Sequence, residues 1–233
     1  AFLDAEITSQ RNLTSANSIN IARWLPQMFY FFFAYKQLKD KKKDLVFSIP
    51  SGNFGNVCAG IMAQQLGLPV KQFIAATNVN DIVPNYLETG VYSPKPSKQT
   101  ISNAMDVGDP SNFIRIQEIY NNNDDLLKEN LSSFSFTDDE TREAMKEIKE
   151  KSDYVADPHG AVGYLGLKKY LENNKAQGIF LETAHPVKFL DVVEPVLRET
   201  IEYPQQIKDV IDKKKVSLKI STYEDLKSYL LNN

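Results

Sequence analysis

Leu45-Val46-Phe47-Ser48-Ile49 runs directly into Pro50-Ser51-Gly52-Asn53-Phe54-Gly55-Asn56, and a helical pattern from Val57 to Leu66 follows. The first segment is short, apolar and partly β-branched, which predicts a buried strand. Glycine and asparagine in the second segment are typical of a tight turn. The stretch therefore predicts a strand, a turn and a helix in immediate succession.

A second strand is expected after this helix. Gly67-Leu68-Pro69 ends the helix, and Val70 to Ala76 has the composition of a strand. Two strands joined through a helix form a βαβ unit, whose strands are expected to be parallel. Another strand is predicted from Gly178 to Glu182. The sequence therefore predicts an α/β protein with three αβα layers and a mainly parallel sheet.

Helical patterns occupy much of the remaining chain. Helices are expected over Ser18–Asp40 with a kink or new start at Pro26, over Asp81–Glu88, from the capping box Thr137–Glu140 to about Lys151, and over Ala161–Asn173, Pro186–Glu199 and Thr222–Leu231. The polar segments Tyr120–Lys128 and Ile207–Val216 are interpreted as connections.

Composition excludes several classes of function. The 233 residues include 27 Lys and Arg against 30 Asp and Glu, and a net charge of −3 predicts no nucleic-acid partner. The most apolar stretch, Met28 to Tyr35, is too short to span a bilayer, so no membrane partner is expected. One cysteine, Cys58, and two histidines predict neither a disulfide framework nor a metal site, and favour a reducing, cytoplasmic location.

The beginning of the chain reads as the interior of a larger protein. It starts at Ala1 without an initiator methionine, and it lacks the charged and small-residue features of a signal peptide. We therefore expect a piece of a longer polypeptide.

The turn between Ile49 and Val57 has the chemistry of an anion site. Its glycines permit close backbone approach, its asparagine amides can donate hydrogen bonds, and a helix N-terminus favours negative charge. The Gly-Lys-Ser/Thr ending of a P-loop and the pattern G-x-G-x-x-G are both absent. From this pattern alone, a phosphate site and a tight turn without a ligand are equally open.

Five stretches, taken in order, resemble threonine synthases. They are Ser15-Ala16-Asn17-Ser18-Ile19-Asn20 running to Arg23, Ser51 to Asn56, Phe73 to Asn78, Ser102-Asn103-Ala104-Met105-Asp106, and Thr183-Ala184-His185-Pro186 with Lys188-Phe189. The resemblance covers nearly all of residues 1–233. It implies the C-terminal part of a lyase that uses pyridoxal 5'-phosphate (PLP), with most of the large cofactor-binding domain of fold type II and without its N-terminal portion.

The resemblance also implies a cofactor site. Gly52, Asn53, Phe54, Gly55 and Asn56 would hold the cofactor phosphate, chiefly through backbone N–H groups. The Thr183 hydroxyl would face the pyridine nitrogen. Judged from local sequence alone, Thr183 would rather be a helix-capping residue ahead of Pro186.

Substrate-binding residues follow from the same resemblance. Asn17, Ser18, Asn20 and Arg23 would bind the substrate phosphate, for which a guanidinium with nearby amides is suited. The alternative is a helix N-cap with a surface arginine. Ser102, Asn103 and Asp106 are further candidates on the substrate side, although these residue types are also common in loops and caps.

No catalytic residue is assigned within the chain. The resemblance places the Schiff-base lysine upstream, and Lys188 is interpreted as a helix residue. His159 and His185 each lie beside a proline at a helix start, so capping or packing is expected of both. The whole enzyme would convert O-phospho-L-homoserine and water to L-threonine and phosphate by γ-elimination and β-addition of water, together with the N-terminal part of the same protein. The chain alone is expected to be inactive.

Two alternatives stay open. Another fold type II enzyme, such as threonine dehydratase or cysteine synthase, also uses a glycine-rich phosphate loop, but gives no reason for Asn17-Ser18-Ile19-Asn20 with Arg23. From a different class, the chain would be a non-catalytic module that binds a phosphate ligand or a partner.

Overall fold

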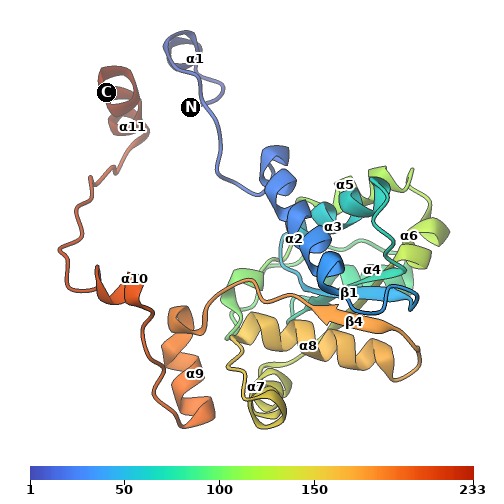
Figure 1. Cartoon of the computed structure of the whole chain (residues 1–233). Helices are drawn as coiled ribbons and strands as arrows, with labels where there is room; N and C mark the ends of the chain where they lie inside the picture. Colours follow the sequence, from blue (N-terminus) through green and yellow to red (C-terminus); the bar gives the residue numbers. More distant parts are fainter. The chain divides into compact units, whose positions relative to one another are not determined.

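A four-stranded parallel sheet forms the centre of the larger part of the chain (Figure 1). The strands are β1 (Leu45–Pro50), β2 (Gln72–Thr77), β3 (Leu131–Ser135) and β4 (Gln177–Phe180), in the order β3-β2-β1-β4. The computed structural model describes residues 1–233, which divide into two compact units. The larger unit comprises residues 18–202 and contains the sheet; the smaller comprises residues 1–17 and 203–233.

Helices surround this sheet and connect its strands. Their bounds in the larger unit are η1 (Ile21–Arg23), α2 (Trp24–Gln37), α3 (Gly55–Gln65), α4 (Ile82–Thr89), η2 (Asn103–Met105), α5 (Phe113–Ile119), α6 (Asp124–Asn130), α7 (Asp138–Ser152), α8 (Pro158–Leu171), η3 (Pro186–Phe189) and α9 (Leu190–Leu197).

Both faces of the central strands are buried, as alternate side chains of β1 show. Phe47 packs in the cluster that includes α2 and α3, and its ring lies 5.0 Å from that of Phe31. Val46, one residue earlier, packs instead against Leu167 of α8. Successive side chains of a strand point to opposite faces, so β1 requires a helical layer on each side. The predicted αβα layers are confirmed.

Helix α8 lies close to the sheet because glycines face it. The Ser48 hydroxyl donates a 2.6 Å hydrogen bond to the Gly163 carbonyl, which satisfies a polar group buried in the sheet. A Cβ at Gly166 would come within 2.7 Å of the Ala76 Cβ and 2.8 Å of the Ser48 Oγ. This close packing fixes the start of α8 relative to the ends of β1 and β4.

Several local predictions are confirmed. Thr137 and Glu140 form the expected capping box of α7. Pro26 lies in the first turn of α2, where a missing backbone N–H costs little, and η1 precedes it as a separate short helix. The helix expected from Pro186 begins as η3 and continues as α9.

Several parts of the chain differ from the prediction: α5 was not expected, and neither were the short helices Ala5–Gln10 and Gln205–Lys208 of the smaller unit. The segment Tyr120–Lys128 is not merely a connection, since α6 begins at Asp124 behind Asn123, whose side chain accepts from the Leu126 N–H. Only Leu127 of this helix is buried, so its sequence lacks the apolar periodicity from which a helix is predicted. Strand β3 was not expected either, because Leu131–Ser135 contains just two apolar residues.

The smaller unit is held by its own contacts between α1 (Ala5–Gln10) and α11 (Tyr223–Asn232), and it also contains α10 (Gln205–Lys208). Arg11 donates to the Leu230 carbonyl at 2.6 Å, and Lys227 lies 3.0 Å from Asp4. Hydrogen bonds from Tyr223 and Lys227 lower the pKa of Asp4 to about 2.

None of the helices is both long and apolar enough to cross a membrane.

Candidate functional site

A cavity of about 730 Å³ opens in the larger unit, where β1 and β4 end. Its walls come from α2, the turn between β1 and α3, η2, the start of α8 and the residues after β4; the lining includes Tyr30, Gly52, Ala104, His159 and Thr183. Within the sheet, β2 and β3 follow β1 on one of its edges, whereas β4 pairs with the other edge of β1. The cavity therefore occupies the switch point of the strand order, where ligands of open α/β sheets bind.

The turn after β1 presents the N-terminus of α3 to this cavity. All five predicted phosphate residues, Gly52 to Asn56, line it. Phe54 has a positive φ of 62° and is the N-cap residue of α3, but its own side chain accepts no hydrogen bond from the helix. Its buried ring packs edge-on against Phe113, with centroids 5.8 Å apart, which holds this uncommon conformation in place. Backbone N–H groups at the N-terminus of a helix form a ready site for an anion.

The two asparagine side chains of the turn serve the protein itself. Asn53 donates to the Ser18 hydroxyl at 2.6 Å and accepts from the backbone N–H of Ser111 at 2.7 Å. Asn56 donates to the Pro50 carbonyl at 2.8 Å and accepts from the Val57 N–H. Both amides therefore brace the turn, and the backbone N–H groups are the donors of the turn that a phosphate could meet.

The loop before and within η2 packs directly on Gly52. A Cβ there would lie 2.8 Å from both the Ala104 carbonyl oxygen and the Met105 Cα, so only glycine fits. This loop is held by a buried network: Asn78 donates to Asp106 at 2.9 Å and to the Ser102 hydroxyl at 3.2 Å. Ser102 and Asp106 thus shape the cavity wall, while Ala104 and Met105 line it.

The remaining predicted substrate residues lie away from the lining, apart from Ser18. Asn20 caps η1 by accepting from the Ala22 N–H at 3.0 Å, and Arg23 is exposed at the end of that helix. Asn103 is exposed at the start of η2. Asn17 belongs to the smaller unit, where its backbone N–H donates to Ser15. The substrate roles of all these residues stay predictions.

Thr183 lines the cavity, three residues beyond the end of β4. It does not cap η3, because His185 is the N-cap residue and accepts from the Val187 N–H at 3.1 Å. The capping expectation for His185 is therefore confirmed. The local alternative for Thr183, a capping threonine ahead of Pro186, is wrong.

His159 is buried at the start of α8, and it also reaches the cavity. Its Nδ1 lies 2.6 Å from the Asp157 Oδ1, its Nε2 accepts from the Ala104 N–H at 3.2 Å, and its ring packs against Phe189. Packing was expected of this residue and is observed. The bond to Ala104 additionally ties α8 to η2.

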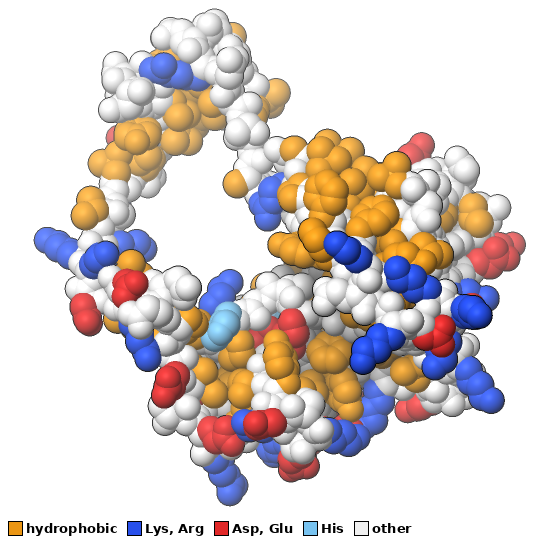
Figure 2. Space-filling view, in the orientation of Figure 1, with side chains coloured by type: hydrophobic (Ala, Val, Ile, Leu, Met, Phe, Trp, Pro, Cys, Tyr) orange, Lys and Arg blue, Asp and Glu red, His pale blue; other side chains and the backbone are white.

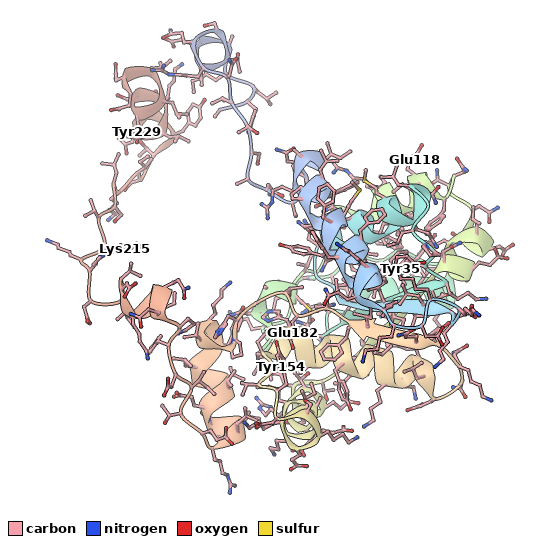
Figure 3. All side chains as sticks on the ribbon, viewed as in Figure 1. Tyr35, Glu118, Tyr154, Glu182, Lys215 and Tyr229 are labelled. Carbon is pink, nitrogen blue, oxygen red and sulfur yellow. The ribbon has the colours of Figure 1, made fainter.

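Glu182 is a site residue that sequence reasoning missed. Figure 3 shows it on the connection after β4, near Tyr154, and it lines the cavity together with Thr183. Burial and the neighbouring Asp157 raise the pKa of Glu182 to about 9. Its position at the end of the predicted strand Gly178–Glu182 was the only signal available, because 25 positions in the sequence separate it from Asp157.

Cys58 has no part in this chemistry. It is fully buried in α3, and burial raises the pKa of its thiol to about 12, so the thiol stays protonated at neutral pH.

Comparison with known proteins places this geometry in a family. A family model described as pyridoxal-phosphate dependent enzyme matches residues 4–179, well over half of the chain. The chain belongs to the pyridoxal-phosphate dependent enzymes. A second model, described as the C-terminal region of threonine synthase, matches residues 160–229. The resemblance of this family member to threonine synthases is thereby confirmed.

The curated relatives of this pyridoxal-phosphate dependent enzyme are named threonine synthase. Threonine synthase of Escherichia coli is 47% identical over 213 residues, which cover 91% of this chain and 49% of that protein. Threonine synthase of Saccharomyces cerevisiae is 37% identical, with 90% and 49% covered. The chain therefore spans about half the length of the curated relatives that it matches.

Solved structures of threonine synthases also match the chain. The crystal structure of threonine synthase from Escherichia coli matches with a TM-score of 0.88 and 44% identity, covering all of this chain and 54% of that one. A PLP-bound threonine synthase from Brucella melitensis matches with a TM-score of 0.87 and 30% identity, covering 99% and 55%. Threonine deaminase from Solanum lycopersicum, at 15% identity and a TM-score of 0.53, shares the fold alone.

Proposed function

We propose that the chain is the C-terminal part of a threonine synthase, and that it supplies the phosphate and ring sites for PLP. The whole protein would convert O-phospho-L-homoserine and water to L-threonine and phosphate, by γ-elimination and β-addition of water. One observation carries the proposal: a single cavity joins the turn at Gly52–Asn56 to Thr183. Its volume of about 730 Å³ falls within the range of small-molecule sites.

The residues present fit this cofactor. No Lys or Arg lines the cavity, so a phosphate there would be bound by the backbone N–H groups of the turn and the partial positive charge of α3. The excluded Cβ at Gly52 keeps the η2 loop close and gives this end of the cavity its shape. When bound, PLP supplies an electron sink for the carbanions of the reaction.

Thr183 would partner the ring nitrogen at the other end. A neutral hydroxyl can donate or accept a hydrogen bond, and it does not force protonation of the nitrogen as a carboxylate would. The cavity wall also contains a carboxyl, Glu182, whose raised pKa of about 9 leaves it uncharged at neutral pH. The pyridine ring of the cofactor would therefore lie beside little negative charge.

The substrate's phosphate would be bound by Asn17, Ser18, Asn20 and Arg23, with Ser102, Asn103 and Asp106 on the substrate side. Ser18 supports this assignment, because it lines the cavity and is bonded to Asn53 of the phosphate turn. A guanidinium with amides and a hydroxyl can bind a dianion through several charge-assisted hydrogen bonds.

The rest of the enzyme would cover an apolar face of α2 and its approach. The α2 patch consists of Ile21, Leu25, Phe29, Tyr30 and Phe33, each at least 49% exposed. Figure 2 shows apolar side chains gathered over this helix. The opposite face of α2 is already buried through Trp24, Met28 and Phe31, and a helix that is apolar all round belongs inside a larger protein.

The Schiff-base lysine would lie in that other part, since no lysine lines the cavity of this chain. Purified 1–233 should therefore form no threonine, while the longer protein should release phosphate and threonine from O-phospho-L-homoserine. Preference of the longer protein for threonine or O-acetylserine would instead show a dehydratase or a cysteine synthase. A cytoplasmic location stays a prediction.

A further inference from the structure

Two carboxyl groups meet in the wall of the cavity. Asp157, the N-cap residue of α8, is fully buried, and Glu182 reaches it from the connection after β4. The Glu182 carboxyl lies over Gly160, where any Cβ would collide with it. The start of α8 and the connection after β4 thus pack closely enough to keep the two carboxyl groups together.

The hydrogen bonds of this pair are incomplete if both carboxyls are ionised. Asp157 Oδ1 accepts from the backbone N–H and Nδ1 of His159, at 2.8 and 2.6 Å. In contrast, Asp157 Oδ2 and Glu182 Oε1 are buried without a hydrogen-bond partner. Buried acceptors without a donor are costly, and one proton shared between the two carboxyls would satisfy both.

His159 cannot supply that proton. Its Nε2 accepts from the Ala104 N–H, which can only donate, so the ring proton lies on Nδ1 and is already given to Asp157 Oδ1. The hydrogen bond from His159 therefore satisfies Oδ1 of Asp157 and leaves Oδ2 without a donor.

The surroundings offer no positive charge to balance a second carboxylate. The titratable groups that face Glu182 are Asp157 and His159 from the start of α8, Tyr154 from the preceding connection, and His185 beyond Thr183. No Lys or Arg lines either of the two cavities that Glu182 borders. Two adjacent carboxylates in such a place repel each other, so one of them keeps a proton.

We propose that Glu182 is a positioning residue: it donates a proton to Asp157 at neutral pH and so fixes the adjacent Thr183 against the start of α8. The hydrogen bonds continue from Asp157 through His159 to Ala104 of η2, which also lines the cavity. One chain of side chains thereby sets the separation of Thr183 from the η2 loop, which packs on Gly52. The role for Thr183 rests on the proposed function; the shared proton does not.

Burial and the neighbouring Asp157 raise the pKa of Glu182 to about 9, in agreement with this arrangement. Loss of the proton would place two negative charges together and release the connection that carries Thr183.

The test uses the chain itself, labelled with ¹³C at glutamate carboxyls and ¹⁵N at backbone amides, and follows both by NMR from pH 5 to 10. One glutamate should titrate several pH units above the others, and its signal should be absent in Glu182→Gln. The amides of Thr183 and Ala104 should shift with the same midpoint in the wild type, and stay constant in Glu182→Gln, whose amide remains a neutral donor to Asp157.

Two results would overturn the proposal: a Glu182 that titrates in the ordinary carboxyl range, or Thr183 and Ala104 amides that do not follow it. Glu182→Ala provides a second check, because it removes the donor and should shift the Thr183 and Ala104 amides at every pH. None of these measurements needs PLP. Failure of the proposed function would appear separately, as a protein that shows this titration but does not respond to PLP at Gly52–Asn56.

Discussion

The Asn53 side chain donates a 2.6 Å hydrogen bond from Nδ2 to the hydroxyl of Ser18. This bond joins the turn at the start of α3 to the segment that leads into η1, and both residues line the same cavity. Since Asn53 also accepts from Ser111, one side chain fixes three segments around the predicted phosphate site.

Replacement of Asn53 should loosen the turn. Asn53→Ala removes the bonds to Ser18 and Ser111 and should lower the free energy of unfolding by about 1–3 kcal/mol. Affinity for PLP, measured by fluorescence titration, should fall roughly tenfold, which corresponds to about 1.4 kcal/mol. Ser111→Ala is the matched control, because its backbone N–H still donates to Asn53. Equal losses in the two variants would contradict this role.

A methyl group at Gly52 should disturb the site more than one at Gly55. Gly52→Ala would place Cβ 2.8 Å from backbone atoms of Ala104 and Met105, whereas at Gly55 the nearest neighbour, the Asn112 amide nitrogen, is 3.5 Å away. Gly52→Ala should cost about 1–3 kcal/mol of unfolding free energy through overpacking. Gly55→Ala should change it by less than about 1 kcal/mol. Chemical denaturation measures both, and a larger cost at Gly55 would refute the packing argument.

The α2 patch should make the isolated chain associate with itself. Phe29→Glu places a charge in this exposed apolar surface and should reduce association in sedimentation velocity, with little effect on the melting temperature. In the longer protein the same change should be strongly destabilising, because the charge would be buried. Gln37→Glu, on the same helix but beyond the patch, adds the same charge as a control. Stability of the longer protein unaffected by Phe29→Glu would show that nothing covers the patch.

The stability of the chain should fall as pH rises. The folded state raises the pKa of Glu182 from 4.5 to about 9, so the folded protein holds a proton that the unfolded chain releases. This contribution is complete below pH 4.5 and is lost as pH rises toward 9, at most by about 1.4 kcal/mol per pH unit. Denaturation of wild type and Glu182→Gln at several pH values should show the slope only in the wild type. A steeper loss in Glu182→Gln would contradict the sign.

Local features of the site were predictable from sequence, because neighbouring residues determine them. The strand at Leu45, the turn at Gly52–Asn56 and the helix after it follow from composition and order alone. The capping box at Thr137 is equally local. In each case the chemistry that forms the element lies within a few residues.

Features that depend on contacts between distant segments were not predictable. Strand β3 forms because Leu131–Ser135 pairs with β2, although its own sequence is mostly polar. Asn53 and Asn56 were expected to face a ligand, yet their partners Ser18, Ser111 and Pro50 take up their amides. Glu182 and Asp157 meet only because α8 packs beside β4. Sequence patterns report periodicity and local capping, and tertiary packing decides the rest.

The most direct test of the account is the backbone amide spectrum of ¹⁵N-labelled 1–233 during titration with PLP, and in parallel with pyridoxal, which lacks the phosphate. If the backbone of the turn binds the cofactor phosphate, the Gly52–Asn56 amides should shift strongly with PLP and much less with pyridoxal, while Thr183 should shift with both. PLP-induced shifts confined to other parts of the chain, or equal effects of the two compounds at Gly52–Asn56, would contradict the account.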